Sequence, residues 1–134
     1  MTYGGNIVKA GEISIDHFVP WPYVAHDEFW NQHPTTRSIN SSKSNNLPDW
    51  NIYFPKLAEL EYHSYKMIWE YDQIHKLFDD CAKDHLNNAD IRQKLYREGL
   101  GQQEFSGCLN EIIYPVYLSA KTCGFKNWEY VANE

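Results

Sequence analysis

Residues 12–48 read EISIDHFVPWPYVAHDEFWNQHPTTRSINSSKSNNLP, and the expected architecture of the N-terminal part follows from this stretch. Apolar and polar residues alternate from Ile13 to Asp16, which is the period of a half-buried β-strand, so a strand region is expected over residues 6–19. The prolines of the segment PWP at 20–22 then force an extended or turning path, because proline restricts both its own backbone and that of its predecessor. The stretch therefore begins as a strand that passes into a loop.

A second strand and a short helix are predicted in the rest of the stretch. Residues 31–36 favour a short strand that Pro34 interrupts or ends. Residues 37–46 are polar and favour a short helix that stops before Pro48. Two strands followed by a helix are thus expected within the first fifty residues.

The sequence after residue 50 has a helical pattern. Apolar residues recur at helical spacing over residues 55–84, with Pro55 suited to a first helical turn, so one long helix is predicted there. Further helices are expected over residues 88–98, with Asn88 as the cap, and over residues 102–121, with a kink at Pro115. The chain therefore divides into residues 1–50 and a mainly helical region, residues 51–134, which we expect to pack together as one compact α+β unit.

The polar residues of the first region occur at fixed spacings. An Asp-His pair, Asp16 and His17, is followed fourteen residues later by Asn31, nine further by Asn40 and three further by Lys43. The set Asp-His-x-x-Pro, Trp-Asn, Asn-x-x-Lys-Ser and a closing Pro is far more specific than any of its parts. This set resembles the motif of the HNH endonucleases, including the version in the HNH domain of RNA-guided CRISPR nucleases.

The resemblance implies a ββα-metal fold, in which a hairpin and a helix hold one divalent cation. Asp16 supplies an anionic oxygen of the kind that Mg²⁺ prefers, and Asn40 is expected to add a neutral carbonyl oxygen. Mg²⁺ is the expected ion, with Mn²⁺ as the alternative. His17 is the expected general base for an attacking water, because histidine titrates nearest to neutral pH.

Two further residues of the motif have expected roles. The resemblance implies a structural role for Asn31, in which its side-chain amide ties the long loop to the backbone near the histidine. Lys43 lies one helical turn after Asn40, so it is expected to face the same side and to neutralise the scissile phosphate as a catalytic residue. His33 and Arg37 are weaker candidates, and His33 is expected to lie outside the group of residues that contact the ion directly.

The composition limits the setting of the protein. Its 134 residues include 12 Lys and Arg against 18 Asp and Glu, a net charge of −6 that is unusual for a protein that binds phosphates. Positive charge is therefore expected to be clustered locally, or another domain or subunit holds the substrate. No apolar run is long enough for a membrane span and no signal peptide is recognised, so a cytoplasmic location is expected.

Cysteine and tryptophan residues are interpreted as structural. The three cysteines are widely spaced and favour free thiols packed in helices rather than disulfides or a zinc site. A metal pair of Cys81 and His85, four residues apart, is the less favoured alternative. Trp21, Trp30 and Trp50 are expected to pack the loop over the hairpin, with stacking against bases as the alternative.

The sequence thus predicts an endonuclease that hydrolyses DNA phosphodiester bonds with His17 and one divalent cation. A non-catalytic or partner-dependent interaction module of a larger restriction or defence complex is the main alternative. An RNase is a third possibility, because such a site accepts either sugar. The short stretch before the motif also suggests a module of a longer protein, with a partner protein or fused domain that supplies substrate binding.

Overall fold

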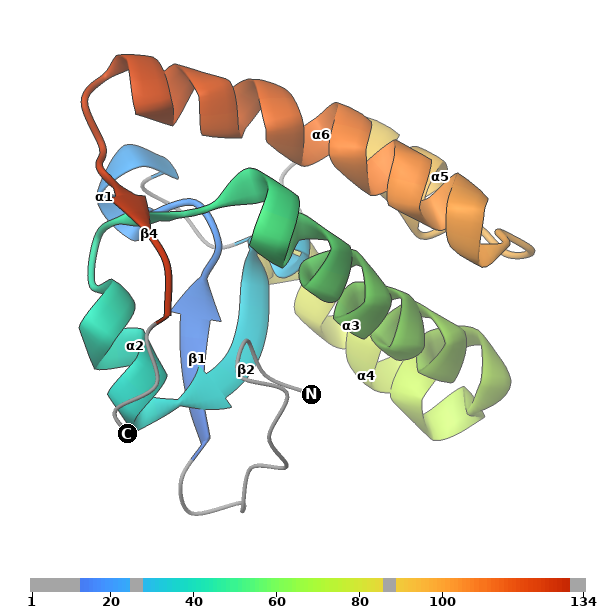
Figure 1. Ribbon diagram of the computed structural model, residues 1–134. Coiled ribbons are helices and arrows are strands. Elements are labelled where there is room, and N and C mark those ends of the chain that lie inside the picture. The colour runs from blue at the N-terminus through green and yellow to red at the C-terminus, as the bar shows by residue number, and fades with distance from the viewer. Residues whose placement is uncertain (1–12, 25–27, 86–88, 131–134) are drawn as a thin grey trace.

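The computed structural model describes residues 13–24, 28–85 and 89–130. Within these ranges the chain forms an α+β fold, with a small sheet and short helices on one side and longer helices on the other (Figure 1). The elements in chain order are β1 (Ile13–His17), α1 (Trp21–Val24), the 3-10 helix η2 (Phe29–Asn31), β2 (Gln32–Thr36), α2 (Arg37–Lys43), β3 (Leu47–Pro48), α3 (Trp50–Glu70), α4 (Asp72–His85), α5 (Ala89–Leu95), α6 (Gln102–Thr122) and β4 (Asn127–Trp128). The predicted fold class is confirmed, and the part of the first strand region before Ile13 lies outside the described residues.

The first described unit is an antiparallel pair of strands followed directly by a helix. In the pairing of β1 with β2, Asp16 lies opposite His33 and Ile15 opposite Pro34. The prediction that Pro34 interrupts or ends the second strand is wrong, since β2 continues to Thr36. A proline is tolerated here because β2 has only one strand neighbour and needs no donor on its outer side.

Helix α2 begins and ends with local caps. The side chain of Thr36 accepts a hydrogen bond of 3.1 Å from the backbone N–H of Ile39, which satisfies one of the free donors of the first turn. The helix ends at Lys43, three residues before the predicted end, where Ser44 takes a positive φ of 48°. Ile39 and Lys43, four residues apart, are its buried residues and therefore lie on one face.

A second, parallel strand pair joins the C-terminal end of the chain to the first unit. The backbone N–H of Leu47 donates to the carbonyl of Lys126 at 2.7 Å, and that of Asp49 donates to the carbonyl of Trp128 at 2.9 Å. The Tyr117 hydroxyl of α6 also donates to the Pro48 carbonyl at 2.8 Å. The strands β3 and β4 are two residues long and were not predicted, because so short a pairing leaves no periodic pattern in the sequence.

The long helix predicted over residues 55–84 is instead two helices, α3 and α4, which lie side by side (Figure 1). Tyr71 separates them: its N–H donates to the Met67 carbonyl at the end of α3, and its carbonyl accepts from the N–H of His75 in α4. A single helix of that length would extend about 45 Å, at 1.5 Å per residue, and leave much of its apolar face without cover. The break allows the apolar faces of both helices to be buried.

The other predicted helix bounds are corrected by small amounts. Helix α3 starts at Trp50, capped by the side chain of Asp49, so Pro55 lies beyond the first turn. Helix α5 ends at Leu95, earlier than predicted, and its expected cap Asn88 lies outside the described residues. Helix α6 agrees within one residue and continues through its internal proline.

One apolar core connects the first unit with the helices after residue 50. Its buried members come from the loop after β1, from α2 and the following strand, and from α3, α5 and α6, and they include Phe18, Val19, Ile39, Leu47, Leu57, Leu95, Phe105, Leu109 and Ile113. Trp30 is buried, and Trp50 is half-buried and stacked on Phe54 with ring centroids 4.3 Å apart. The predicted core position of Trp21 is wrong, because 49% of this side chain is exposed.

Cys81, Cys108 and Cys123 are free, as predicted, but Cys81 and Cys123 are exposed rather than packed. None of the helices in the described ranges is long and apolar enough to cross a membrane.

Candidate active site on the β1–α2 unit

Lys43 links helix α2 to strand β1 from inside the protein. Its side chain is 0% exposed, and Nζ donates to Asp16 Oδ1 at 3.2 Å and to the His17 carbonyl at 2.7 Å. A buried ammonium group needs such partners, because the loss of hydration otherwise costs several kcal/mol, as an order of magnitude. The Lys43 ammonium group thus links Asp16 and His17, which are neighbours in β1, to helix α2.

Asp16 is buried in an environment that keeps it ionised. Only 4% of it is exposed, and its Oδ1 also accepts a hydrogen bond of 2.8 Å from the backbone N–H of His17. Burial raises the pKa of Asp16, but the contacts with His33 and Lys43 outweigh it, so its pKa lies below the ordinary 3.8. The carboxylate is therefore anionic at neutral pH.

His33 is the neighbour of Asp16 that the sequence analysis placed in a lesser role. It is buried on β2 directly opposite Asp16, and its Nε2 lies 3.4 Å from Asp16 Oδ2. Burial lowers the pKa of His33 below 6.5 despite the opposing effect of Asp16, so the imidazole is neutral at pH 7. The strand register is the signal that places His33 here, and it becomes readable only when the pairing partner of Asp16 is known.

Asn31 connects the loop to the segment just after His17. It is 0% exposed, its Oδ1 accepts from the Val19 N–H at 2.8 Å, and its Nδ2 donates to the Val19 carbonyl at 3.0 Å. The Asn31 carbonyl also accepts from the N–H of Phe18 at 2.8 Å. These hydrogen bonds tie the loop that contains Asn31 to the backbone just after His17.

Asn40 packs on β1 one helical turn before Lys43. Its Nδ2 donates to Ser14 Oγ at 2.7 Å and lies 3.4 Å from the Ile15 carbonyl. The residue of α2 that contacts the Asp16 carboxylate is therefore Lys43, whereas Asn40 contacts the two residues before it. Asn40 and Lys43 do share the face of α2 that is turned toward β1.

The oxygen atoms near β1 are compatible with a hard divalent cation. Oδ2 of Asp16 lies 3.4 Å from His33 Nε2, and the Asn40 amide makes its hydrogen bonds to β1 through Nδ2. No group of three His, Cys, Asp or Glu side chains arranged for a metal occurs in the part of the chain that the structure describes. Two protein oxygens would leave the other positions to water and substrate, as Mg²⁺ sites commonly do.

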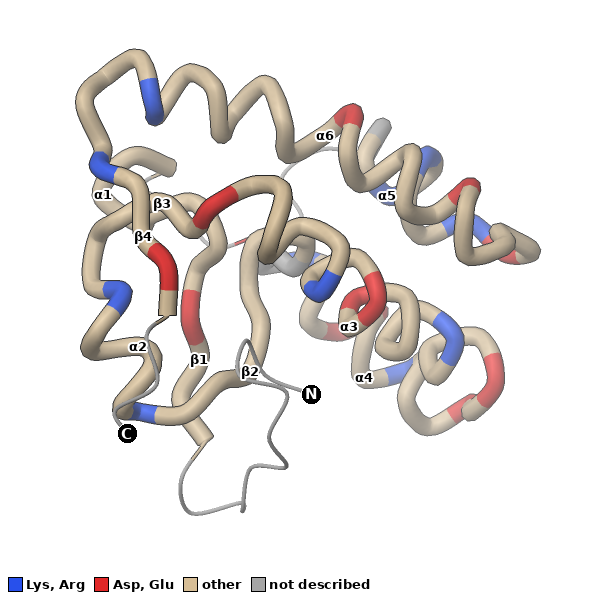
Figure 2. The backbone as a smooth tube through the Cα atoms, viewed as in Figure 1, with Lys and Arg blue, Asp and Glu red and all other residues tan. Residues whose placement is uncertain are grey.

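Charge is mixed over most of the chain but locally basic on α2. Basic and acidic residues are interspersed along α3 and α4, whereas α2 carries Arg37 and Lys43 and no acidic residue (Figure 2). Lys43 is buried against Asp16, whereas Arg37 is exposed. The two positive charges of α2 therefore offset only a small part of the net charge of −6 of the whole chain.

The comparison with protein families concerns the same unit. Residues 2–49 match the family model described as HNH endonuclease. No curated protein and no solved structure matches the chain. The match indicates nuclease activity and a nucleic-acid substrate in general, and the likeness to the CRISPR-associated version stays a prediction. Residues 2–49, which include the Asp-His pair on β1 and the helix α2 packed against it, belong to the HNH endonuclease family.

Proposed function

We propose that the protein is a metal-dependent endonuclease that hydrolyses DNA phosphodiester bonds. The observation that carries the proposal is the match of residues 2–49 to the HNH endonucleases, in a segment whose Asp16 and His17 lie against α2. Hydrolysis of a phosphodiester needs a nucleophile, a group that takes its proton and positive charge near the phosphate. The residues of this unit offer candidates for each of these needs.

His17 is the proposed general base. Its backbone is fixed on both sides, since its N–H donates to Asp16 and its carbonyl accepts from Lys43. Its side chain is half-buried, which leaves part of the imidazole within reach of water. A base held in one place takes a proton from an attacking water more effectively than a mobile one.

Asp16 and Asn40 are the proposed ligands of one divalent cation, with Mg²⁺ expected and Mn²⁺ as the alternative. When bound, such an ion offsets the negative charge that develops on the phosphate and helps the departing oxygen to leave. The ionised carboxylate of Asp16 would supply most of the attraction for the ion, and Asn40 a neutral oxygen.

Lys43 is proposed to fix the positions of Asp16 and His17 rather than to contact the substrate. The sequence analysis expects it at the scissile phosphate, but its Nζ is buried between Asp16 and the His17 carbonyl. A direct phosphate contact would require both of these bonds to open. We therefore assign Lys43 the task of holding the carboxylate and the base in register, and Arg37 becomes the candidate for the phosphate.

The region after residue 50 is proposed to support this unit and to hold partners. We propose that residues 1–50 form the nuclease part and residues 51–134 the helical part of one compact unit, because the described apolar residues of both form a single core. With a net charge of −6, tight binding of DNA by this chain alone is not expected. A partner protein or fused domain is therefore proposed to bring the substrate to the site.

A plasmid-nicking assay tests the activity. We expect nicking with Mg²⁺ or Mn²⁺, loss of nicking with a chelator, and a decrease of at least about a hundredfold in His17→Ala. The matched control is His63→Ala, which removes an exposed histidine of α3 and should cut like the parent. If His17→Ala cuts as fast as the parent, the proposed base is wrong.

The ion requires a measurement of its own. Binding of Mn²⁺, followed by the electron paramagnetic resonance signal of the free ion, should weaken at least about tenfold in both Asp16→Asn and Asn40→Ala. If the parent and both variants bind Mn²⁺ with equal affinity, Asp16 and Asn40 are not ligands of the ion, whether or not the protein cleaves DNA.

The second candidate function is a non-catalytic or partner-dependent module of a larger restriction or defence complex. It is favoured by the acidic charge and by large apolar side chains exposed on the helical region, among them Met67, Tyr71 and Leu77. Absence of nicking on both DNA and RNA with either metal, in a folded protein, would favour this function. Cleavage of RNA but not DNA would instead identify an RNase.

A further inference from the structure

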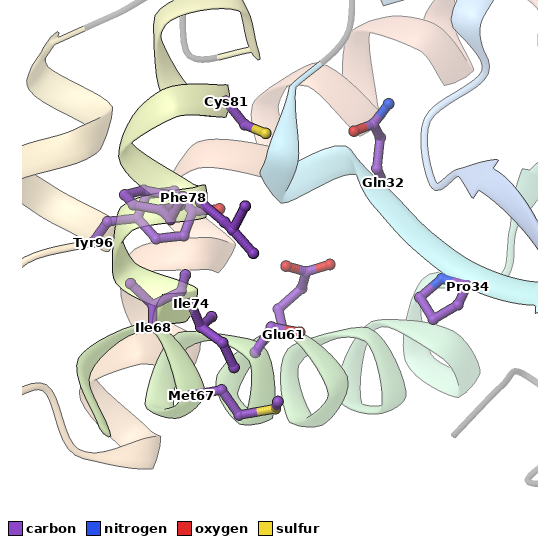
Figure 3. Close-up of a pocket in the computed structure, with 11 residues that line it drawn as sticks. Gln32, Pro34, Glu61, Met67, Ile68, Ile74, Phe78, Cys81 and Tyr96 are labelled. Atoms are coloured by element: carbon purple, nitrogen blue, oxygen red, sulfur yellow. The ribbon is translucent and has the colours of Figure 1, made fainter. Parts of the chain in front are cut away.

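A cavity of about 340 Å³ lies between the strand β2 and the helices α3 and α4 (Figure 3). These helices lie on the opposite side of the strand pair from α2 (Figure 1). Gln32 and Pro34 border it from β2, and Tyr96, just after α5, closes it from the other side. Its volume is in the range of pockets that bind small organic molecules. The cavity belongs to none of the steps proposed for hydrolysis.

The walls of the cavity are mainly apolar. Residues from the end of α3 and from α4 make up most of the lining: Met67, Ile68, Ile74, Leu77, Phe78. The rings of Phe78 and Tyr96 lie together, with centroids 5.0 Å apart. Such a surface favours an occupant with an apolar body, because the removal of apolar surface from water lowers the free energy.

Two polar groups stand in this apolar lining without partners. Glu61 is 8% exposed and directs its carboxyl group into the cavity (Figure 3), where no described residue donates a hydrogen bond or forms an ion pair with it. Tyr96 is 5% exposed, and its buried hydroxyl also makes no hydrogen bond within the described ranges. The Glu61 carboxyl group faces the cavity, whereas the Tyr96 hydroxyl has almost no accessible surface, so Glu61 is the polar group that an occupant of the cavity can reach.

The charge of the lining is one-sided. Glu61 is its acidic residue, and the described residues that border the cavity include no Lys, Arg or His. Burial raises the pKa of Glu61 well above 4.5, and Glu61 in turn contributes to a raised pKa of Tyr96. A positive charge at this position would relieve both effects, because an opposite charge favours the ionised carboxylate.

We propose that this cavity is a binding site for a small organic cation, an apolar molecule that carries a primary ammonium group. The ammonium group pairs with the carboxylate of Glu61. The apolar body contacts the side chains of α3 and α4 that line the cavity. A neutral molecule of the same shape gains the apolar contacts but leaves the carboxyl group without an opposite charge.

Isothermal titration calorimetry with benzylammonium tests the proposal, with benzyl alcohol as the neutral molecule of similar shape. We expect saturable binding of benzylammonium at least about tenfold tighter than that of benzyl alcohol, and loss of this preference in Glu61→Gln. Glu70→Gln makes the same charge change at an exposed position of α3, and it should bind like the parent. Equal affinity for the two molecules, or an unchanged preference in Glu61→Gln, would overturn the proposal.

A measurement on the parent protein keeps the test independent of the folding of any variant. Cys81 borders the cavity and is exposed, whereas Cys123 is exposed just beyond the end of α6. Saturating benzylammonium should slow the alkylation of Cys81 by iodoacetamide at least about threefold and leave Cys123 unchanged, as measured by mass spectrometry. If both cysteines react at unchanged rates, the molecule does not occupy this cavity and the proposal is wrong.

Discussion

Replacement of Lys43 by methionine tests the internal cation on which the geometry of the Asp-His pair depends. Methionine is similar in length and apolar, so it fills much of the same space without a charge. Lys43→Met removes the contact of 3.2 Å with Asp16 Oδ1 and the hydrogen bond of 2.7 Å to the His17 carbonyl. The Asp16 carboxylate, 4% exposed, then remains buried without its ammonium partner.

The expected loss of stability follows from opposing contributions. Removal of one partner of a buried ion pair costs about 3–5 kcal/mol. Part of this cost is offset because the buried ammonium group is itself unfavourable, as shown by the pKa of Lys43, which burial lowers below 10.5 against the opposing effect of Asp16. We therefore expect Lys43→Met to lower the free energy of unfolding by about 3 kcal/mol, a large part of the 5–15 kcal/mol of a typical domain.

Urea unfolding at pH 7 in the presence of a chelator measures this loss without any contribution of bound metal. Asp16→Asn alone should cost a similar amount, and Asp16→Asn with Lys43→Met should cost about 2 kcal/mol less than the sum of the two, because no uncompensated charge remains. The reasoning is refuted if Lys43→Met costs less than about 1 kcal/mol, or if the two losses add within about 0.5 kcal/mol.

The same pair predicts a dependence on pH. Since the folded pKa of Asp16 lies below 3.8, its contribution to stability is present above pH 3.8 and is lost as the pH falls through the folded value. Lys43→Met removes an interaction that lowers this pKa, so the variant should lose its structure at a higher pH during acid titration. An unchanged acid midpoint would contradict the assigned ion pair.

Three further predictions concern other buried polar groups. Asn31→Ala should cost about 2–4 kcal/mol in urea unfolding, because it leaves a buried N–H and a buried carbonyl of the loop without partners, and a loss below about 1 kcal/mol would contradict this. The folded pKa of Glu61 is raised, so the native state keeps this proton to a higher pH than the unfolded state does, and the parent should lose stability as the pH rises above 4.5. Glu61→Gln should remove this loss. Parallel stability profiles of parent and variant against pH would contradict the prediction. Tyr65→Phe should cost about 1–3 kcal/mol by leaving the buried N–H of Leu100, now 2.9 Å from the Tyr65 hydroxyl, without an acceptor, and an unchanged thermal midpoint would refute that assignment.

The local elements of the first fifty residues were largely readable from the sequence. The alternation up to Asp16, the polar run over residues 37–46 and the closing proline are local signals, and the ββα order follows from them. The Asp-His pair and the asparagines are recognisable because their spacings are fixed along the chain. What the spacing does not contain is burial, and therefore Lys43 was expected at a phosphate rather than inside the protein.

The helical region shows a similar limit. Apolar periodicity places helices after residue 50, but it runs without interruption across Tyr71 and does not reveal that α4 folds back on α3. The pairing of β3 with β4 joins residues about eighty positions apart and consists of two residues on each side. Neither feature has a signature within a short window, because both depend on contacts between distant parts of the chain.

The sequence by itself determined the fold class, the order of strands and helix in the first unit, and the motif that belongs to the HNH endonucleases. The tertiary structure alone decided that Lys43 and His33 converge on Asp16 and that Glu61 faces an apolar cavity. The physical reason is that residue type and spacing act along the chain, whereas burial and charge compensation arise between segments that meet only after folding.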